Sequence, residues 1–392
     1  MPKLIYFGGF IVIGAALIGG QLLRLSLGGI TVTALDLAVL GWAAVWLLDL
    51  LIHLRRYPLP RFGWWAGLFM VLAIVALIGA GRWIGVREIM ISATYLLRWV
   101  AYGLLVFMGY HLAKSSRPVN VLGLIFGLVA IIGISQWLIL PDLSWLERLG
   151  WDPHQGRLVS TFLDPNFVGG FLVVGLALAL PQLLTRGRAA QRWYWGVLTS
   201  LMLVGIYLTF SRSALLALIV AAFIIGALRY RWVALGLMLV LVAAYLASPK
   251  LQERVKGAFT LDQTARYRIA SWQEGWNIIK HEPIIGVGFN TLPYTRPQYG
   301  YWPAGHAASG FDSSLLTVGA TTGGLGLLAY LGILVSAVLL AWRKWRAKAA
   351  PIALTFLAAT GALLVHSLFV NSLLYPSVLV VWWIILGLVW AI

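Results

Sequence analysis

The stretch from Trp193 to Leu228 contains a single charged residue, Arg212, in a run of aliphatic, aromatic and small residues. As one helix it would be roughly 54 Å long at 1.5 Å per residue, nearly twice a hydrocarbon core of about 30 Å. The chain must therefore cross a membrane, turn and cross back, with the turn at Thr209-Phe-Ser-Arg-Ser213. An ionisable residue at such a tip is a candidate anion-binding group, and an arginine that snorkels to lipid headgroups is the competing interpretation.

The composition assigns the whole chain to the membrane class. Hydrophobic residues make up 61%, charged residues 10%, and the mean hydropathy is +0.89. We expect one integral membrane domain over residues 1–392, with a retained first span because no small-residue cleavage site follows the apolar start. The net charge of +17 would suit a nucleic-acid binder, but in a polytopic protein basic excess marks cytoplasmic loops and contact with anionic lipid. The absence of cysteine excludes disulfides and thiolate chemistry.

The fold class that follows is an all-α polytopic membrane protein with about twelve transmembrane helices. The apolar spans are 4–23, 29–52, 63–81, 90–112, 119–140, 167–184, 193–210, 213–228, 232–247, 314–341, 350–371 and 374–391. Every second connection is basic, with Arg55, Arg56 and Arg61; Lys114 and Arg117; Arg186, Arg188 and Arg192; Arg229 and Arg231; Arg343, Lys344, Arg346 and Lys348. By the positive-inside rule this alternation predicts that both termini are cytoplasmic.

The same alternation places the 141–166 loop, the Arg212 turn and a long connection at 248–313 on the external face. That connection lies between the ninth and tenth spans. Within it, Ile269, Trp272, Trp276 and Ile279 recur at three- and four-residue spacing, which predicts a helix over Gln263–His281. Such a helix is expected to lie on the membrane plane or against the bundle. The glycines that follow, Gly286 and Gly288, are more typical of a turn than of a phosphate cradle.

Cations on the external face need an explanation other than the positive-inside rule. They include Arg157, Arg212, Arg266 and Arg268, and guanidinium groups bind diphosphate oxygens in bidentate fashion. Two candidate general bases accompany them, Asp312, which also suits a helix N-cap, and His306, which also suits a solvated loop. Tyr294 and Trp302 could stack on sugar rings or lie at the lipid interface. No paired carboxylates at metal-ligand spacing and no histidine cluster stand in the sequence, so no metal is expected.

Four segments resemble the O-antigen ligase and O-antigen polymerase superfamily of membrane glycosyltransferases, over roughly residues 157–330. They are Arg157 to Asn166, with its Pro-Asn ending; Thr209-Phe-Ser-Arg212-Ser213; Arg268-Ile-Ala-Ser-Trp272 with Pro283-Ile-Ile-Gly-Val-Gly288; and Asp312-Ser-Ser through Gly323-Gly-Leu-Gly326. The resemblance implies metal-independent, inverting transfer of a glycan from an undecaprenyl diphosphate carrier, without a cofactor, on the external face of the cytoplasmic membrane. It implies a glycolipid acceptor, lipid A core or related, in ligases, and a carrier-linked repeat unit in polymerases.

Carried over by position, the resemblance assigns Arg212 and Arg268 to the diphosphate. Arg157 and Arg266 are further candidate cations for it, and the candidate glycan or acceptor contacts are Asn166, Trp272, Tyr294 and Trp302. The catalytic histidine of the ligases falls at Asp312, so the base is either Asp312 or His306. A transporter or flippase of an anionic lipid-linked glycan is the alternative from another class. Its expected charges deep within spans are few here, namely Asp36 and Arg98.

Overall fold

The computed structural model describes residues 3–53, 57, 59–115, 117–185, 187–302 and 309–392. A helix is present at each of the twelve predicted apolar spans: α1 (Lys3–Gly19), α2 (Ala34–His53), α3 (Arg61–Gly79), α4 (Val86–Leu112), α5 (Arg117–Ile139), α6 (Pro165–Leu184), α7 (Ala189–Thr209), α8 (Arg212–Leu228), α9 (Arg231–Ala247), α13 (Ser314–Lys348), α14 (Pro351–His366) and α15 (Pro376–Ala391). Within the described residues, seven helices are long and apolar enough to cross a membrane, or eight with one bent pair. The chain is a polytopic membrane protein, and the exact count of twelve spans stays a prediction.

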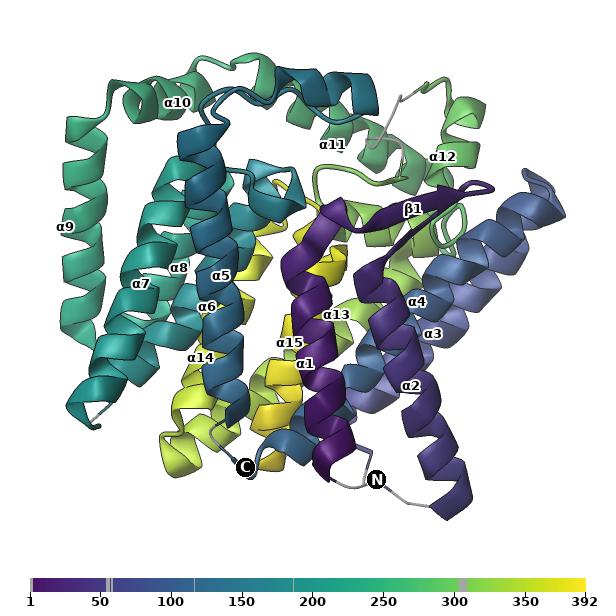
Figure 1. Cartoon of the computed structure of the whole chain (residues 1–392). Helices are drawn as coiled ribbons and strands as arrows, with labels where there is room; N and C mark the ends of the chain where they lie inside the picture. The colour runs from purple at the N-terminus through teal and green to yellow at the C-terminus, as the bar shows by residue number, and fades with distance from the viewer. Residues whose placement is uncertain (1–2, 54–56, 58, 116, 186, 303–308) are drawn as a thin grey trace.

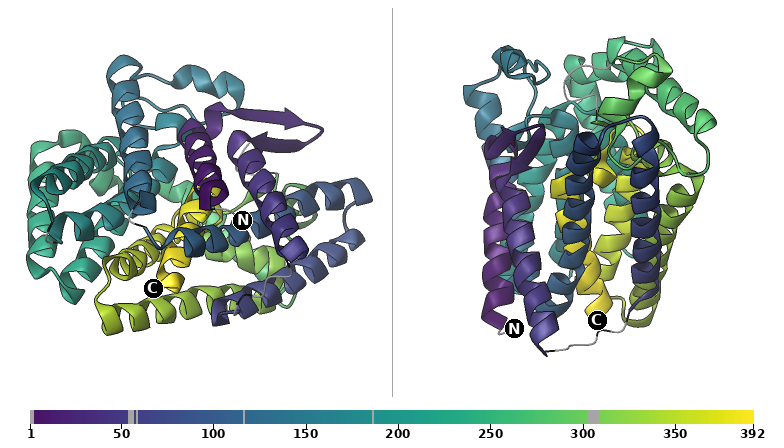
Figure 2. Two further views of the ribbon diagram at one scale, coloured as in Figure 1. Left: turned by 60° about the horizontal axis from the view of Figure 1, so that its bottom comes forward. Right: turned by 90° about the vertical axis from the view of Figure 1, so that its right-hand side faces the viewer.

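The connection between α9 and α13 lies across one end of the bundle, here called the capped end. It contains α10 (Pro249–Phe259), α11 (Gln263–His281) and α12 (Leu292–Thr295). The chain bends by 98° between α9 and the α10–α11 segment, so these helices run across the bundle axis. Both termini lie at the opposite end (Figures 1 and 2). The helix predicted at Gln263–His281 is thus present with those bounds.

Short elements complete the architecture. The 3-10 helices in the described residues include η1 (Gly20–Leu22), η2 (Ala80–Arg82), η3 (Ser144–Leu149), η4 (Ser160–Phe162), η5 (Arg296–Tyr299) and η7 (Ser372–Leu374). The expectation of a purely helical chain needs one correction, because β1 (Arg24–Leu27) and β2 (Ile30–Thr33) form an antiparallel hairpin. Gly28 and Gly29 supply the two positive φ angles that its two-residue turn requires. The prediction had assigned residues 29–33 to the second span.

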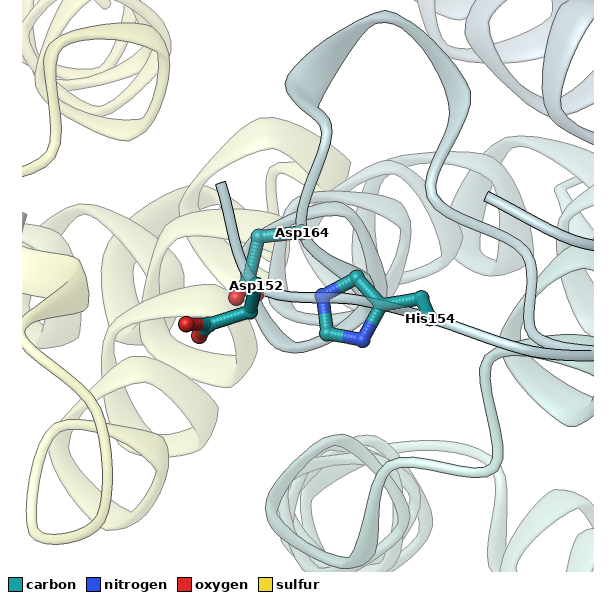
Figure 3. A group of neighbouring side chains, drawn as sticks. All are labelled: Asp152, His154 and Asp164. Atoms are coloured by element: carbon teal, nitrogen blue, oxygen red, sulfur yellow. The ribbon is translucent and has the colours of Figure 1, made fainter. Parts of the chain in front are cut away.

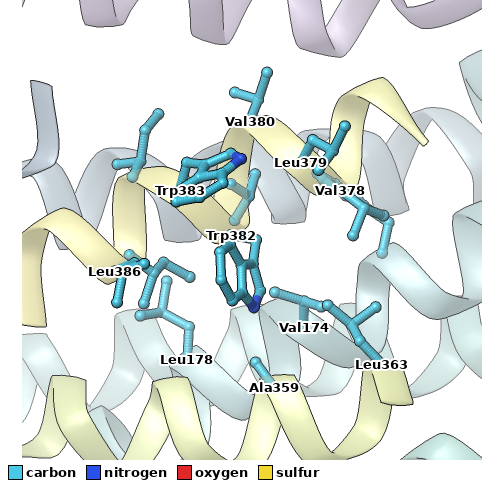
Figure 4. Close-up of a cluster of buried hydrophobic side chains, with 14 of the residues drawn as sticks. Val174, Leu178, Ala359, Leu363, Val378, Leu379, Val380, Trp382, Trp383 and Leu386 are labelled. Atoms are coloured by element: carbon cyan, nitrogen blue, oxygen red, sulfur yellow. The ribbon is translucent and has the colours of Figure 1, made fainter. Parts of the chain in front are cut away.

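The core of the bundle is built around α15 and α6. Nearly every residue of α15 is buried. Trp382 packs among side chains of α6 and α14 (Figure 4), and Trp383 contacts Phe62 of α3 and Trp99 of α4. Gly109 of α4 and Gly387 of α15 face each other's backbone, and a Cβ atom on either would collide with the other helix. Small residues at such contacts allow membrane helices to approach closely, because packing and not water exclusion drives their association.

A break in α13 anchors the capped end to the bundle. Gly323 has φ +66° and interrupts the helix. The segment at 283–288 fills the break: Val287 N donates to Ala320 O at 2.9 Å, Gly288 N to Thr321 O at 3.0 Å, and Gly324 N to Pro283 O at 2.7 Å. Gly286 and Gly288 have positive φ angles and let this segment approach the backbone of α13 closely, and the broken helix keeps its polar groups paired.

Candidate functional site

The helical hairpin turn places Arg212 at the capped end. Helix α7 ends at Thr209 and α8 begins at Arg212, so the turn falls where the sequence predicted it. Phe210 adopts the left-handed conformation, with φ +48°, and Ser211 caps α8 through its side chain. The guanidinium of Arg212 thus projects from the first residue of a helix, whose N-terminal dipole also favours anions.

Arg212 is held by a bidentate ion pair. Its two terminal nitrogens donate to the two carboxylate oxygens of Asp262, each at 3.0 Å, and Nη1 also donates to the carbonyl of Arg254 at 3.2 Å. Asp262 is itself the N-cap of α11 and accepts from Ala265 N at 2.8 Å. Burial opposes ionisation of Asp262, but the bonds from Arg212 and Ala265 prevail and lower its pKa. The pair fixes the guanidinium and ties α8 to α11.

Two further guanidiniums approach this pair from other elements. Arg157, on the loop before η4, donates from Nε to Thr209 O at 2.8 Å, and its buried Nη2 has no hydrogen-bond partner. Arg254 of α10 likewise has a buried Nε without a partner. Burial, followed by the charge of Arg254, lowers the pKa of Arg157 to about 9. Buried donors without partners amid like charges are the features of a site that an anion would stabilise.

Arg268 of α11 lies beside Asp312. Burial lowers the pKa of Arg268, Asp312 opposes that shift, and Arg212 adds to it. Burial raises the pKa of Asp312. The charge of Arg268 lowers it in part, whereas the carboxylates of Asp164 and Asp152 raise it further. Its backbone is fixed on α11, because Asp312 N donates to Ser271 Oγ at 2.9 Å and Asp312 O accepts from Trp272 Nε1 at 3.0 Å. A carboxylate with a raised pKa beside a guanidinium suits proton transfer.

Polar side chains at the Arg212 turn form a continuous series of contacts. Asn166 accepts through Oδ1 from Ser211 Oγ at 2.8 Å, and Ser211 Oγ lies 3.1 Å from Ser213 Oγ. Ser213 Oγ in turn lies 3.3 Å from Nε2 of the buried His366. Asn166 therefore belongs to the Arg212 turn, where its amide orients the capping serine.

Other predicted residues fall elsewhere. Arg266 is exposed, about 200° around α11 from Arg268 at 100° per residue, and its Nε donates to Leu261 O at 2.9 Å. Tyr294 interacts electrostatically with Tyr95 and Glu88 near the start of α4, and Trp302 is 80% exposed. The fold thus does not bring Arg266, Tyr294 or Trp302 into the arginine group. His306 lies outside the described residues.

Sequence reasoning missed Arg254 and Asp262. The sequence does carry a signal for α10, because Ser248-Pro249 is a typical helix start. Arg254 also lies on the external connection, where the positive-inside rule does not account for a basic residue. The partnership of Asp262 with Arg212 spans fifty positions and leaves no local pattern.

The fold also brings together a group of possible metal ligands. Asp152, His154 and Asp164 offer donor atoms within 4.8 Å of one another (Figure 3). The sequence predicted no such group, because the spacing of these residues matches no metal motif and only the packing of the loop on α6 unites them.

Residues 197–331 match the family model described as O-antigen ligase. This segment belongs to the O-antigen ligase family. The superfamily predicted from four motifs is therefore confirmed for this segment, and the match supports a membrane enzyme of the O-antigen ligase and polymerase type. A search of curated proteins found no match.

The O-antigen ligase segment holds most of the site described above. It contains Arg212, Arg254, Asp262, Arg268 and Asp312, whereas Arg157 precedes it. The arrangement can bind an anion with several charge-assisted bonds and can accept a proton at one carboxylate within the same group.

Proposed function

We propose that the chain transfers a glycan from an undecaprenyl diphosphate carrier to an acceptor hydroxyl on the external face of the cytoplasmic membrane. One observation carries the proposal: guanidiniums from four separate elements act on one another, and one of them, Arg268, lies beside the half-buried carboxylate of Asp312, largely inside the O-antigen ligase segment. Arginines suit a diphosphate because they stay charged and bind its oxygens in pairs. The acceptor is lipid A core or a related glycolipid.

In the proposed reaction, the acceptor oxygen attacks the anomeric carbon while Asp312 takes the hydroxyl proton. The bond from that carbon to the diphosphate oxygen breaks, its electron pair leaves with the diphosphate, and the configuration inverts. Arg268, Arg212, Arg157 and Arg254 stabilise the charge that develops on the leaving group. A departing diphosphate needs no proton, so one base is sufficient.

The test is transfer of a labelled carrier-linked glycan by the purified full-length protein in detergent. Arg268→Ala is expected to lower the rate by about 10² or more, since it removes a donor to the developing charge. Arg266→Ala is the matched control, because Arg266 lies on the same helix but faces away, and we expect nearly full activity. Equal activity of both variants would overturn the proposal.

The products separate the two related reactions. A single glycan joined to a glycolipid acceptor indicates ligation, and a ladder of carrier-linked repeats without any glycolipid product indicates polymerisation. Movement of the lipid-linked glycan across vesicles without any new bond would indicate a transporter.

The base can be assigned by pH dependence. Asp312 must be deprotonated to act, so the rate is expected to fall as the pH drops through its pKa, which burial holds above the ordinary aspartate value. Asp312→Asn is expected to abolish transfer, whereas His306→Ala retains it with the same acidic limb. Loss of activity in His306→Ala together with full activity in Asp312→Asn would assign the base to His306.

A further inference from the structure

A buried histidine faces two carboxylates at the capped end. Asp152 and His154 lie on the loop between η3 and η4, and Asp164 is the N-cap of α6. Figure 3 shows a ring nitrogen of His154 facing the two aspartates, with the carboxylate of Asp152 turned away from the ring. Their donor atoms lie within 4.8 Å of one another.

The imidazole has an unmet bonding requirement. His154 is only 8% exposed, and its buried Nε2 has no hydrogen-bond partner. A buried polar atom without a partner is unfavourable, and native proteins usually satisfy such atoms through protein, water or an ion. Because this nitrogen is directed at two aspartates, a cation between the three groups would satisfy it.

The surrounding backbone holds the donors in place. Leu143 N donates to His154 O at 2.9 Å, and a β-bridge joins Asp142 to Gln155, so His154 lies on a fixed segment. Asp164 uses Oδ1 to accept from Asn166 N at 2.7 Å and Phe167 N at 2.9 Å. Within the described chain, Oδ2 of Asp164 forms no hydrogen bond and stays available. Ligands oriented by such outer bonds are typical of metal sites.

The donor set favours a transition-metal cation. One imidazole nitrogen and two carboxylates suit Zn²⁺ or Mn²⁺ better than Ca²⁺ or Mg²⁺, whose ligands are oxygens. A cation about 2.0–2.2 Å from each donor needs donors no more than about 4.4 Å apart. The exposed side chain of Asp152 can rotate to close the small remaining distance.

Charges of both signs act at this position. Arg157 and Arg254 act on His154 and Arg268 acts on Asp164, and all three oppose a cation, whereas the carboxylates of Asp152 and Asp164 favour one. The carboxylate of Asp312 also interacts with both aspartates. Three acidic groups therefore face the position from the loop, α6 and the segment before α13.

We propose that Asp152, His154 and Asp164 bind one divalent transition-metal cation, Zn²⁺ or Mn²⁺. The ion would join the 141–164 loop to the start of α6 and so hold Arg157, which stands on the same loop. It takes no part in bond making or breaking, and the proposal is independent of glycan transfer because its test measures binding alone.

The experiment uses the full-length protein in detergent, without a polyhistidine tag and stripped with a chelator. Zn²⁺, Mn²⁺, Ca²⁺ and Mg²⁺ are titrated separately, and bound metal per protein and the apparent Tm are measured. Wild type is expected to bind one equivalent and to gain several degrees in Tm at saturation. Asp152→Asn and His154→Ala are expected to lower the affinity at least tenfold. Glu147→Gln removes an exposed acid from the same loop and is expected to behave as wild type.

Each result decides the proposal. Less than one equivalent in wild type, or equal affinity in Asp152→Asn and wild type, would overturn it. A Tm response to Ca²⁺ or Mg²⁺ but not to Zn²⁺ or Mn²⁺ would overturn the assigned class of ion. Because Asp152 is exposed, Asp152→Asn should fold normally, and it decides the question even if His154→Ala does not fold.

Discussion

At the scale of single residues, Arg212 and Asp262 fix the geometry of one part of the proposed diphosphate site. The bidentate pair directs the guanidinium and prevents it from turning toward lipid headgroups. Its position at a helix start and beside Arg268 favours the functional interpretation of Arg212 over snorkelling. The carboxylate that orients Arg212 must also compete with any diphosphate for the same two donors.

This competition gives a prediction for Asp262→Asn. Asparagine keeps the N-cap of α11 but removes the competing charge, so diphosphate affinity is expected to rise about tenfold. Competition by inorganic pyrophosphate in the transfer assay measures the effect, with Glu147→Gln as a control of equal charge change. Weaker inhibition in Asp262→Asn than in wild type would mean that Asp262 is needed to orient Arg212.

At the scale of elements, the broken helix α13 joins the capped end to the bundle. The backbone bonds from the segment at 283–288 satisfy the groups that the break at Gly323 exposes. Asp312 precedes the same helix and is fixed to α11 by Ser271 and Trp272. The relative positions of Asp312 and Arg268 therefore depend on how α11 and α13 are connected.

Gly323→Ala tests this connection. The residue has positive φ, and a Cβ would collide with the Ile284 carbonyl, so we expect destabilisation of at least about 2 kcal/mol. The apparent Tm in detergent should fall by several degrees, together with activity. Gly236→Ala in α9, where a Cβ meets nothing within 4 Å, should change Tm little. Similar Tm values for the two variants would contradict this account.

At the scale of the whole molecule, the termini lie at one end of the bundle and α10, α11 and α12 at the other (Figure 1). The sequence predicts which end is external, because the basic connections mark the cytoplasmic side. The arginines of the site are thus expected to face outward.

Single cysteines can test this orientation, because the chain has none of its own. Thr260→Cys and Ala347→Cys lie at exposed positions near α10 and at the end of α13. A membrane-impermeant maleimide applied to intact spheroplasts should label Thr260→Cys, and it should label Ala347→Cys only after permeabilisation. The reverse pattern would invert the topology.

The sequence alone determined the membrane class, the twelve helical segments, the turn at Arg212 and the helix Gln263–His281. These follow from local patterns, namely apolar length, loop charge and helical periodicity, which a single segment carries by itself. The hairpin at β1 and β2 was missed because β2 adjoins an apolar span and its residues read as the start of that span.

Only the tertiary structure decided which charged residues meet. It placed Arg268 beside Asp312 and left Arg266 of the same helix exposed. It added Arg254, paired Arg212 with Asp262, and set His154 against Asp152 and Asp164. The geometry of these contacts depends on how the segments pack together in the fold. No local pattern in the sequence encodes that packing.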